Sequence, residues 1–217
     1  MENNIITVEF FHDVLCAWCY AISPRVYKLA LQYPNQIKIV HRAFPLAPEP
    51  DGIAQIFGTK ERGKLEILDH WRNANRNDDE HRINAELMAT KSYDYPYSTP
   101  GLLACKSAEL QGGNLMHGRM FDRIQKAHLT ECYNINDFEI LKMCAVEVGL
   151  DVAKWENDYN GAEVKQMLGE DVYKARQYGV NSVPTLIANG KYKLNGAQPF
   201  SSIEKWLNEA LKNITNN

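Results

Sequence analysis

The sequence has no apolar segment long enough to cross a membrane. None of its hydrophobic runs approaches the ~18 consecutive apolar residues expected of a transmembrane helix. The N-terminal residues, Met-Glu-Asn-Asn, also lack the positive charge and the apolar stretch of a secretory signal peptide. We therefore expect a cytoplasmic protein that does not associate with membranes.

The sequence also has little excess charge of either sign. It contains 24 Lys and Arg against 27 Asp and Glu, which gives a formal net charge of −3. Proteins that bind nucleic acid or anionic lipid usually carry a basic excess or a basic patch. The charge balance therefore gives no electrostatic reason to expect nucleic acid as a partner. With 217 residues, of which 45% are hydrophobic, the chain suits one large domain or a small domain with a substantial insertion.

Cysteine is sparse, and only one pair of cysteines is close in the sequence. Of the five residues, Cys16 and Cys19 are separated by two positions, and the others are widely spaced. An odd number without regular spacing excludes a densely disulfide-bonded secreted domain. We expect Cys105, Cys132 and Cys144 to be reduced thiols that are buried or partly buried.

Strand-forming residues lie at both ends of the chain, with helix-forming residues between them. The stretches at 5–11 and 36–44 are rich in β-branched and aromatic residues and flank a helical pattern at 17–32. Near the C-terminus, "VPTLIANGKYKLNG" predicts two strands joined by an Asn-Gly turn, and Pro199 begins a last amphipathic helix. Helical segments are predicted between these ends at 59–76, 98–113, 115–131, 136–150 and 162–179. This order indicates an α/β fold with a helical insertion.

The sequence Cys16-Ala-Trp-Cys19 fits either half of a zinc site or a redox-active dithiol. A structural zinc site usually takes its other ligands from a second Cys-x-x-Cys or a His-x₃₋₅-His unit, and the sequence has neither, so we predict no metal site. A strand followed by a cysteine and a helix would place Cys16 at the positive end of the helix dipole, exposed and favoured as a thiolate. Cys19 would lie one turn further on, more buried and protonated, where it can resolve a mixed disulfide. The redox dithiol is therefore the better interpretation.

Pro184 stands directly before a predicted strand, where proline is usually unfavourable. It fits a trans proline at the first residue of the strand. It also fits a cis Val183–Pro184 bond that turns the backbone of Val183 toward the dithiol. Considered alone, the residues favour the trans proline, because the cis form is the minority even before proline.

Two segments resemble the DsbA-like members of the thioredoxin superfamily. "DVLCAWCY" is similar to the Asp-Val-x-Cys-Pro-Trp-Cys-Tyr signature of the FrnE-type DsbA family, and "GVNSVPTLIANGKYKLNGAQP" is similar to that family's segment from Gly-Val-x-x-Val-Pro to Gly-Ala-Gln-Pro. The resemblance covers nearly the whole chain and implies an α/β, thioredoxin-like fold with a large all-helical insertion. Residues 1–48 and 179–217 would form a discontinuous thioredoxin-like domain, and residues 49–178 the insertion.

The resemblance also implies a thiol–disulfide oxidoreductase. Cys16 would attack a disulfide in a protein or a small thiol, and Cys19 would resolve the mixed disulfide. No cofactor would be tightly bound, and glutathione or another thiol could serve as redox partner. The residues implied to bind the substrate surround the dithiol: Val183, through its backbone, Pro184, as a cis-proline, Trp18, Ala17 and Asp13.

The chain departs from the family pattern at two points. Ala17 replaces the family's usual proline, and no histidine lies between the two cysteines. The strong acidification of the first thiol in oxidising DsbA is therefore not implied here. The sequence does not indicate the oligomeric state or the physiological substrate.

Two alternative functions remain. The related 2-hydroxychromene-2-carboxylate isomerases and kappa-class glutathione transferases share the Asp13-like and Val-Pro positions. They typically have serine in place of Cys16 and lack the cysteine pair, so the retained pair favours redox chemistry. The second alternative is a binding or holdase-like module in which the thiols are incidental and the Tyr- and Pro-rich segment 92–100 lines a substrate groove.

Overall fold

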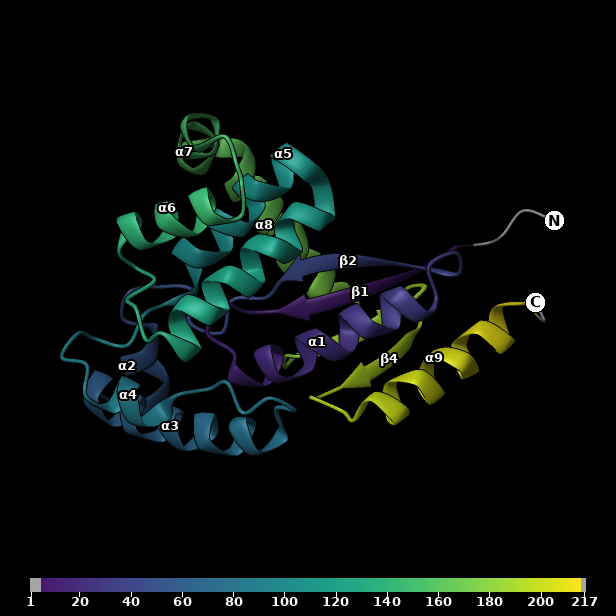
Figure 1. Ribbon diagram of the computed structural model, residues 1–217, viewed down its shortest axis with the longest axis horizontal. Helices are drawn as coiled ribbons and strands as arrows, with labels where there is room; N and C mark the ends of the chain where they lie inside the picture. The colour runs from purple at the N-terminus through teal and green to yellow at the C-terminus, as the bar shows by residue number, and fades with distance from the viewer. Residues whose placement is uncertain (1–4, 216–217) are drawn as a thin grey trace.

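A computed structural model of the chain describes residues 5–215. A four-stranded sheet forms the centre of the protein. The strand order is β2-β1-β3-β4 (Figure 1). β1 pairs with β2 in parallel, whereas β3 is antiparallel to both of its neighbours. The strands are β1 (Ile6–His12), β2 (Ile37–Ala43), β3 (Thr185–Ala188) and β4 (Tyr192–Asn195). All four were predicted from the sequence, within about two residues at their ends.

The hairpin between β3 and β4 is closed by the predicted Asn-Gly turn. Asn189 and Gly190 have positive φ angles of 51° and 68°, a conformation that these two residue types adopt most readily. The backbone N–H of Lys191 donates to the carbonyl oxygen of Ala188 at 3.1 Å. The turn prediction is therefore confirmed.

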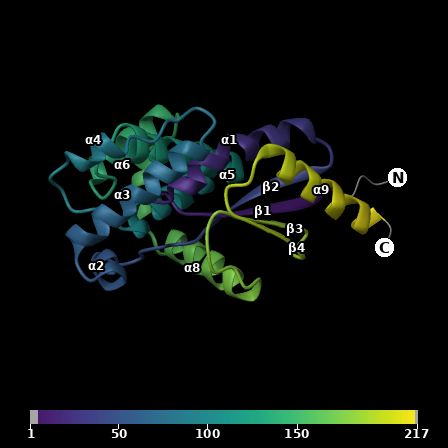
Figure 2. The ribbon, with the colours of Figure 1, turned by 90° about the horizontal axis from the view of Figure 1, so that it is seen from below.

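Helices cover both faces of the sheet (Figure 2). On one face lie α1 (Ala17–Gln32), the second half of α5 (Ser98–Gln125) and α9 (Phe200–Thr215), and there Phe10 joins the main hydrophobic core. On the other face lies α8 (Ala162–Gln177), whose Ala175 packs in a smaller cluster with Phe11. Because successive side chains of a strand point to opposite faces, Phe10 and Phe11 bind the two helical layers to the same strand.

The chain between β2 and β3 is helical, as predicted. Its helices are α2 (Gly52–Phe57), α3 (Lys60–Asn77), α4 (Ala85–Ala89), α5 (Ser98–Gln125), the π-helical turn η1 (Lys126–Thr130), α6 (Phe138–Glu147), α7 (Val152–Asn160) and α8. The sequence did not predict α2, α4 or α7. These helices are short, and α7 fully buries only Trp155, so they show no repeating apolar stripe. Within residues 5–215, no helix is both long enough and apolar enough to cross a membrane.

Helix α5 contains a sharp break at Gly112 and Gly113. Gly113 has a φ of 61°, outside the helical range, and two helical halves meet there. The predicted division into helices at 98–113 and 115–131 therefore corresponds to a break within one longer element.

The predicted domain boundaries at residues 48 and 179 stay a prediction. Nevertheless, α8, the last helix of the predicted insertion, packs directly on the sheet.

Asp122 on α5 connects that helix to α1. Its carboxylate accepts a hydrogen bond of 2.6 Å from the Ser23 hydroxyl. Burial raises the pKa of Asp122 from 3.8 to about 6, although hydrogen bonds from Ser23 and Tyr27 partly oppose the rise. Because the folded-state pKa lies above the unfolded value, this group contributes stability below pH 4 that is lost as the pH rises through about 6.

Replacing Asp122 by asparagine should remove this contribution. The free energy of unfolding of Asp122→Asn, minus that of the wild type, should increase by up to about 3 kcal/mol between pH 4 and pH 7, since one pKa unit corresponds to about 1.4 kcal/mol. Urea denaturation at fixed pH values measures both quantities. A difference that stays constant over this range would contradict the assignment.

Candidate functional site

Cys16 caps the N-terminus of α1. Its backbone is extended, with φ −79° and ψ 104°, and its sulfur accepts a hydrogen bond of 3.3 Å from the backbone N–H of Cys19. No acidic residue lies in the first turn of α1. The sulfur therefore faces the unpaired N–H groups and the positive end of the helix dipole, as the sequence predicted.

Both thiols of the pair are buried, but to different degrees. Cys16 keeps 6% of its surface exposed and Cys19 keeps none. Burial raises the pKa of Cys19 well above its usual value, and the hydrogen bond with Cys16 raises it further. The prediction that Cys19 is buried is confirmed, and the raised pKa agrees with its predicted protonated state. The prediction that Cys16 is exposed is wrong, because α2 and α3 help to form a pocket around its sulfur.

The loop that leads into β3 contributes Val183 to the site. The Cys16 thiol lies 3.6 Å from the carbonyl oxygen of Val183, within the longer range of a sulfur hydrogen bond. The Val183–Pro184 peptide bond is cis, so the cis alternative is confirmed over the trans bond that the residues alone favoured. The fold thus brings Val183 to Cys16, although 167 positions separate them.

Asp13 supports the loop that leads to Cys16. One carboxylate oxygen accepts a hydrogen bond of 3.0 Å from Leu15 N–H, and the other accepts bonds of 2.5 Å from Leu46 N–H and 2.6 Å from the Ser98 hydroxyl. Burial raises the pKa of Asp13 to about 6, and these hydrogen bonds limit the rise. Asp13 is fully buried and its oxygens are occupied. The observed contacts of Asp13 hold this loop, and its predicted role in substrate binding stays a prediction.

The Ser98 hydroxyl joins Asp13 to the neighbouring chain. It donates to Asp13 and also accepts a hydrogen bond of 3.0 Å from the backbone N–H of Ala47. We expect Ser98→Ala to lower the free energy of unfolding by about 2–4 kcal/mol, because two buried partners lose a hydrogen bond.

The matched control for this variant is Ser107→Ala. Ser107 is also buried on α5, but its hydroxyl only donates to a carbonyl of its own helix, that of Leu103. The control should change stability by less than about 1 kcal/mol, since alanine is the better helix former. Equal losses for the two variants, measured by chemical denaturation, would contradict the role assigned to Ser98.

Gln125, at the end of α5, holds the same loop from the other side. Its side-chain amide donates to the carbonyl oxygens of Asp13 at 3.2 Å and Cys16 at 3.0 Å. Sequence reasoning missed both Gln125 and Ser98. Each lies on a helix far from the dithiol in sequence, and no motif distinguishes it from other polar helical residues.

A largely apolar pocket of about 280 Å³ opens beside the Cys16 sulfur. Trp18, Ala17 and Val183 line it, as expected for the residues predicted to surround the dithiol. The insertion supplies most of the opposite wall. The sequence did not predict the part that comes from α2 and α3, which consists of Ile53, Ile56, Phe57, Ile67 and Trp71, whereas the alternative of a binding module had placed the segment of Tyr95 along a substrate groove. Tyr95 belongs to the Tyr- and Pro-rich segment, and its hydroxyl accepts a hydrogen bond of 3.0 Å from the Trp71 indole.

The remaining cysteines differ from the pair in their surroundings. Cys105, Cys132 and Cys144 are free and buried, as predicted. Burial raises the pKa of Cys132 and of Cys144 to about 11. Such thiols stay protonated near neutral pH and react poorly, so these cysteines are poor candidates for a reactive thiol.

Comparison with known proteins connects this geometry to a family. A family model described as "DSBA-like thioredoxin domain" matches residues 7–208. The curated relatives include the ClpXP adapter protein SpxH of Shouchella clausii, 27% identical over 222 residues, and that of Halalkalibacterium halodurans, 30% identical over 192 residues. The matches cover 95% and 86% of this chain but only 67% and 59% of these relatives.

Solved structures share the fold over nearly their full length. A Nitrosomonas europaea protein provisionally assigned as a protein disulfide isomerase matches with a TM-score of 0.78 and 19% identity, covering 97% of this chain and 99% of that one. The cytosolic disulfide reductase DsbM of Pseudomonas aeruginosa, also solved with GSH, matches with a TM-score of 0.73 and 18% identity, covering 97% and 100%. A 2-hydroxychromene-2-carboxylate isomerase gives 0.70 and 16%, covering 97% and 98%.

Proposed function

On the premise that the chain belongs to the DSBA-like thioredoxin domain family, we propose that it is a thiol–disulfide oxidoreductase. One observation carries the proposal. The Cys16 sulfur lies at the N-terminus of α1 and at the wall of an apolar pocket, with the buried thiol of Cys19 one turn away. This arrangement separates an attacking thiol that a substrate can reach from a resolving thiol that it cannot.

The proposed reaction has two exchange steps. The Cys16 thiolate attacks one sulfur of a substrate disulfide, a mixed disulfide forms, and the other sulfur leaves as a thiol after taking up a proton. Cys19 then loses its proton and attacks the Cys16 sulfur, which releases the second substrate thiol and leaves a Cys16–Cys19 disulfide. The substrate has gained two electrons. Two molecules of an external thiol such as glutathione then return two electrons to the pair and leave as a disulfide, which restores both thiols.

The pocket supports a substrate with an apolar segment beside its disulfide. The carbonyl of Val183 next to Cys16 can accept a hydrogen bond from an extended substrate backbone, and the aromatic wall can contact an adjacent side chain. We propose a disulfide-containing peptide or protein, or a small disulfide, as substrate. Glutathione is a redox partner in this proposal and not a tightly bound cofactor. The DsbM structure with GSH and the cytosolic description of that protein support this choice and a cytoplasmic location.

Ile56 allows a test of this substrate class. It lines the pocket, yet 58% of its surface is exposed, so a change there should not disturb the core. We expect Ile56→Lys to raise the KM for a peptide disulfide with a leucine beside its cysteine by about tenfold, since burial of an aliphatic side chain is worth about 1.5 kcal/mol or more. The matched control is Leu65→Lys, an exposed residue outside this pocket. Equal KM values for wild type and Ile56→Lys would contradict the assignment of the pocket.

The curated relatives support a second candidate function, that of a protein adapter. Those relatives are described as ClpXP adapter proteins, although this chain spans about 59–67% of the length of the two compared above. An adapter needs a binding surface and no redox turnover. A complex with purified ClpX that persists in the Cys16→Ala/Cys19→Ala variant would support this function, and failure to bind ClpX would exclude it.

The glutathione-dependent isomerase stays an alternative prediction. Its support is the fold shared with 2-hydroxychromene-2-carboxylate isomerase. Cys16 and the second thiol at position 19 favour redox chemistry instead. Isomerisation that needs glutathione and proceeds without oxidation of the pair would favour this alternative.

A further inference from the structure

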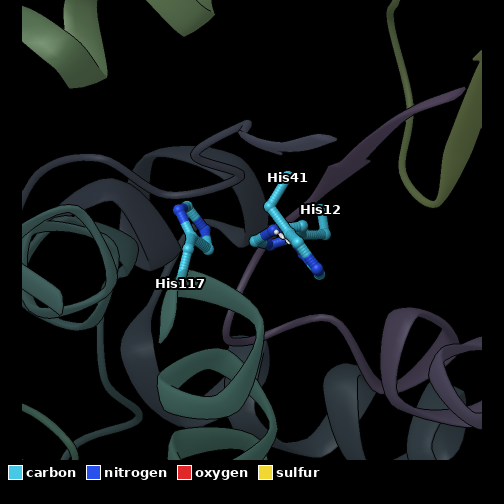
Figure 3. Close-up of side chains that lie close together, drawn as sticks. All are labelled: His12, His41 and His117. Carbon is cyan, nitrogen blue, oxygen red and sulfur yellow. Dashed lines mark hydrogen bonds between the residues drawn. The ribbon is translucent and has the colours of Figure 1, made fainter. Parts of the chain in front are cut away.

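Three buried histidines meet at the end of β1, where the chain continues toward Cys16 (Figure 3). His12 is the last residue of β1, His41 lies on β2 and His117 lies on α5. Their side chains are 0%, 4% and 0% exposed. One ring nitrogen of each histidine lies within 4.8 Å of those of the other two. The cluster lies outside the pocket described above and takes no part in the proposed reaction.

Two nitrogens of this cluster are buried without a hydrogen-bond partner in the part of the chain that the structure describes. His41 Nδ1 and His12 Nε2 are paired with each other by a hydrogen bond of 3.2 Å. Within residues 5–215, neither His12 Nδ1 nor His117 Nε2 has a hydrogen-bond partner, although both are buried. Buried polar atoms in native proteins are almost always satisfied, and a bound ion is one explanation for the exception at His117 Nε2.

A carboxylate orients His117 as it would a metal ligand. His117 Nδ1 lies 2.7 Å from a carboxylate oxygen of Glu109, so it is the nitrogen that carries the proton and donates. The unpartnered Nε2 is then left with its lone pair. Histidines that bind metals commonly donate their other N–H to a carboxylate in this way.

The backbone leaves room for His41 in the cluster. A Cβ atom at position 118 would lie 2.7 Å from His41 Nε2, so glycine is needed where α5 passes this imidazole. The nearest cation is Lys106, whose ammonium group is paired with Glu109 at 2.9 Å and with Asp171 at 2.5 Å. Its charge is therefore balanced locally and does not exclude a cation from the cluster.

We infer that His12, His41 and His117 bind one divalent transition-metal ion of the zinc class, which connects β1 and β2 to α5. Two imidazole nitrogens bound to a tetrahedral zinc ion at about 2.0–2.1 Å lie about 3.3 Å apart, close to the 3.2 Å between His41 and His12. His117 would complete three protein ligands and leave a fourth position open. Imidazole nitrogens suit Zn²⁺, Cu²⁺ and Ni²⁺ rather than Mg²⁺ or Ca²⁺.

The sequence alone gave no indication of this site and predicted no metal site. The three histidines lie far apart along the chain and form no spaced pair. The parallel register of β1 and β2 and the packing of α5 on β2 bring them together. This inference is independent of the proposed function.

The test uses the full chain without a polyhistidine tag and with Cys16→Ser and Cys19→Ser, so that the dithiol cannot supply the ligands; the absence of thiolate charge-transfer bands checks the three remaining thiols. We expect one equivalent of Zn²⁺ per chain by elemental analysis after removal of weakly bound metal. Co²⁺ should give the visible absorption of a tetrahedral site without thiolate charge-transfer bands. His117→Gln and His41→Gln, in the same background, should each weaken Co²⁺ binding by about 100-fold or more.

The matched control is His81→Asn, which changes an exposed histidine outside the cluster and should leave Co²⁺ affinity unchanged. Zinc should also raise the Tm of the Cys16→Ser/Cys19→Ser protein but not that of a folded His117→Gln or His41→Gln variant in the same background. Bound metal below about one-tenth of an equivalent per chain at saturating zinc would overturn the inference. Unchanged affinity in both cluster variants would also overturn it, as binding would then occur elsewhere.

Discussion

Replacing Cys16 by serine is expected to lower disulfide reductase turnover by about 1000-fold or more. A serine hydroxyl does not ionise near neutral pH and cannot form a mixed disulfide, so the first exchange step is lost. The side chain of Cys16 contacts Cys19 N–H, Val183 O and the Cys19 thiol, and a hydroxyl can preserve the contact with the N–H group. The variant should therefore fold, and its defect should be in chemistry rather than stability.

Turnover is measured with a peptide disulfide under an excess of glutathione and coupled glutathione reductase. The matched control is Cys132→Ser, which changes a buried free thiol outside the pocket whose sulfur bonds to the carbonyl oxygen of Asn84. This control should retain at least about half of the wild-type turnover, since it changes no group that contacts the substrate. Full activity of Cys16→Ser would show that the thiol at this position is not the nucleophile.

Replacing Cys19 by serine is expected to trap the mixed disulfide. Cys16 can still attack. The contact to its sulfur at the N-terminus of α1 comes from the backbone N–H of residue 19, which the substitution does not change. The resolving thiol is absent, so the substrate stays bound to Cys16. Release then requires attack by an external thiol, and turnover of a peptide disulfide should fall by about 100-fold.

Mass spectrometry of the intact Cys19→Ser protein after reaction with excess peptide disulfide should show close to one peptide per chain. Addition of a reductant should remove the peptide. The Cys16→Ser/Cys19→Ser double variant is the control and should carry none. Equal labelling of the double variant would mean that another cysteine reacts with the substrate.

The sequence was sufficient to predict the dithiol and the strand and helix on either side of it. The strand pattern of residues 5–11 ends shortly before Cys16, and a helical pattern follows, so the cap position of Cys16 on α1 is a local property. The Asn-Gly turn is likewise local. The residues alone favoured a trans bond before Pro184, and only the resemblance to a known family favoured the cis bond.

Features that depend on distant packing could not be predicted. The sequence gave no sign of α2, because this helix has six residues and buries only Gly52 and Ile53, too few for a periodic pattern. Since α2 forms part of the pocket wall, the burial of Cys16 was missed with it. Ser98 and Gln125 were missed for the same physical reason: a polar side chain on a helix does not reveal from its sequence which loop it will hold.

The most direct test of the dithiol is its reduction potential. The protein is equilibrated in glutathione buffers of graded poise, and the disulfide between Cys16 and Cys19 is followed by thiol alkylation and by the fluorescence of Trp18. We expect one two-electron transition, with a potential closer to the value of about −270 mV for thioredoxin than to about −120 mV for DsbA, because no histidine between the cysteines stabilises the reduced form. A dithiol that forms no internal disulfide at any poise would contradict the redox function.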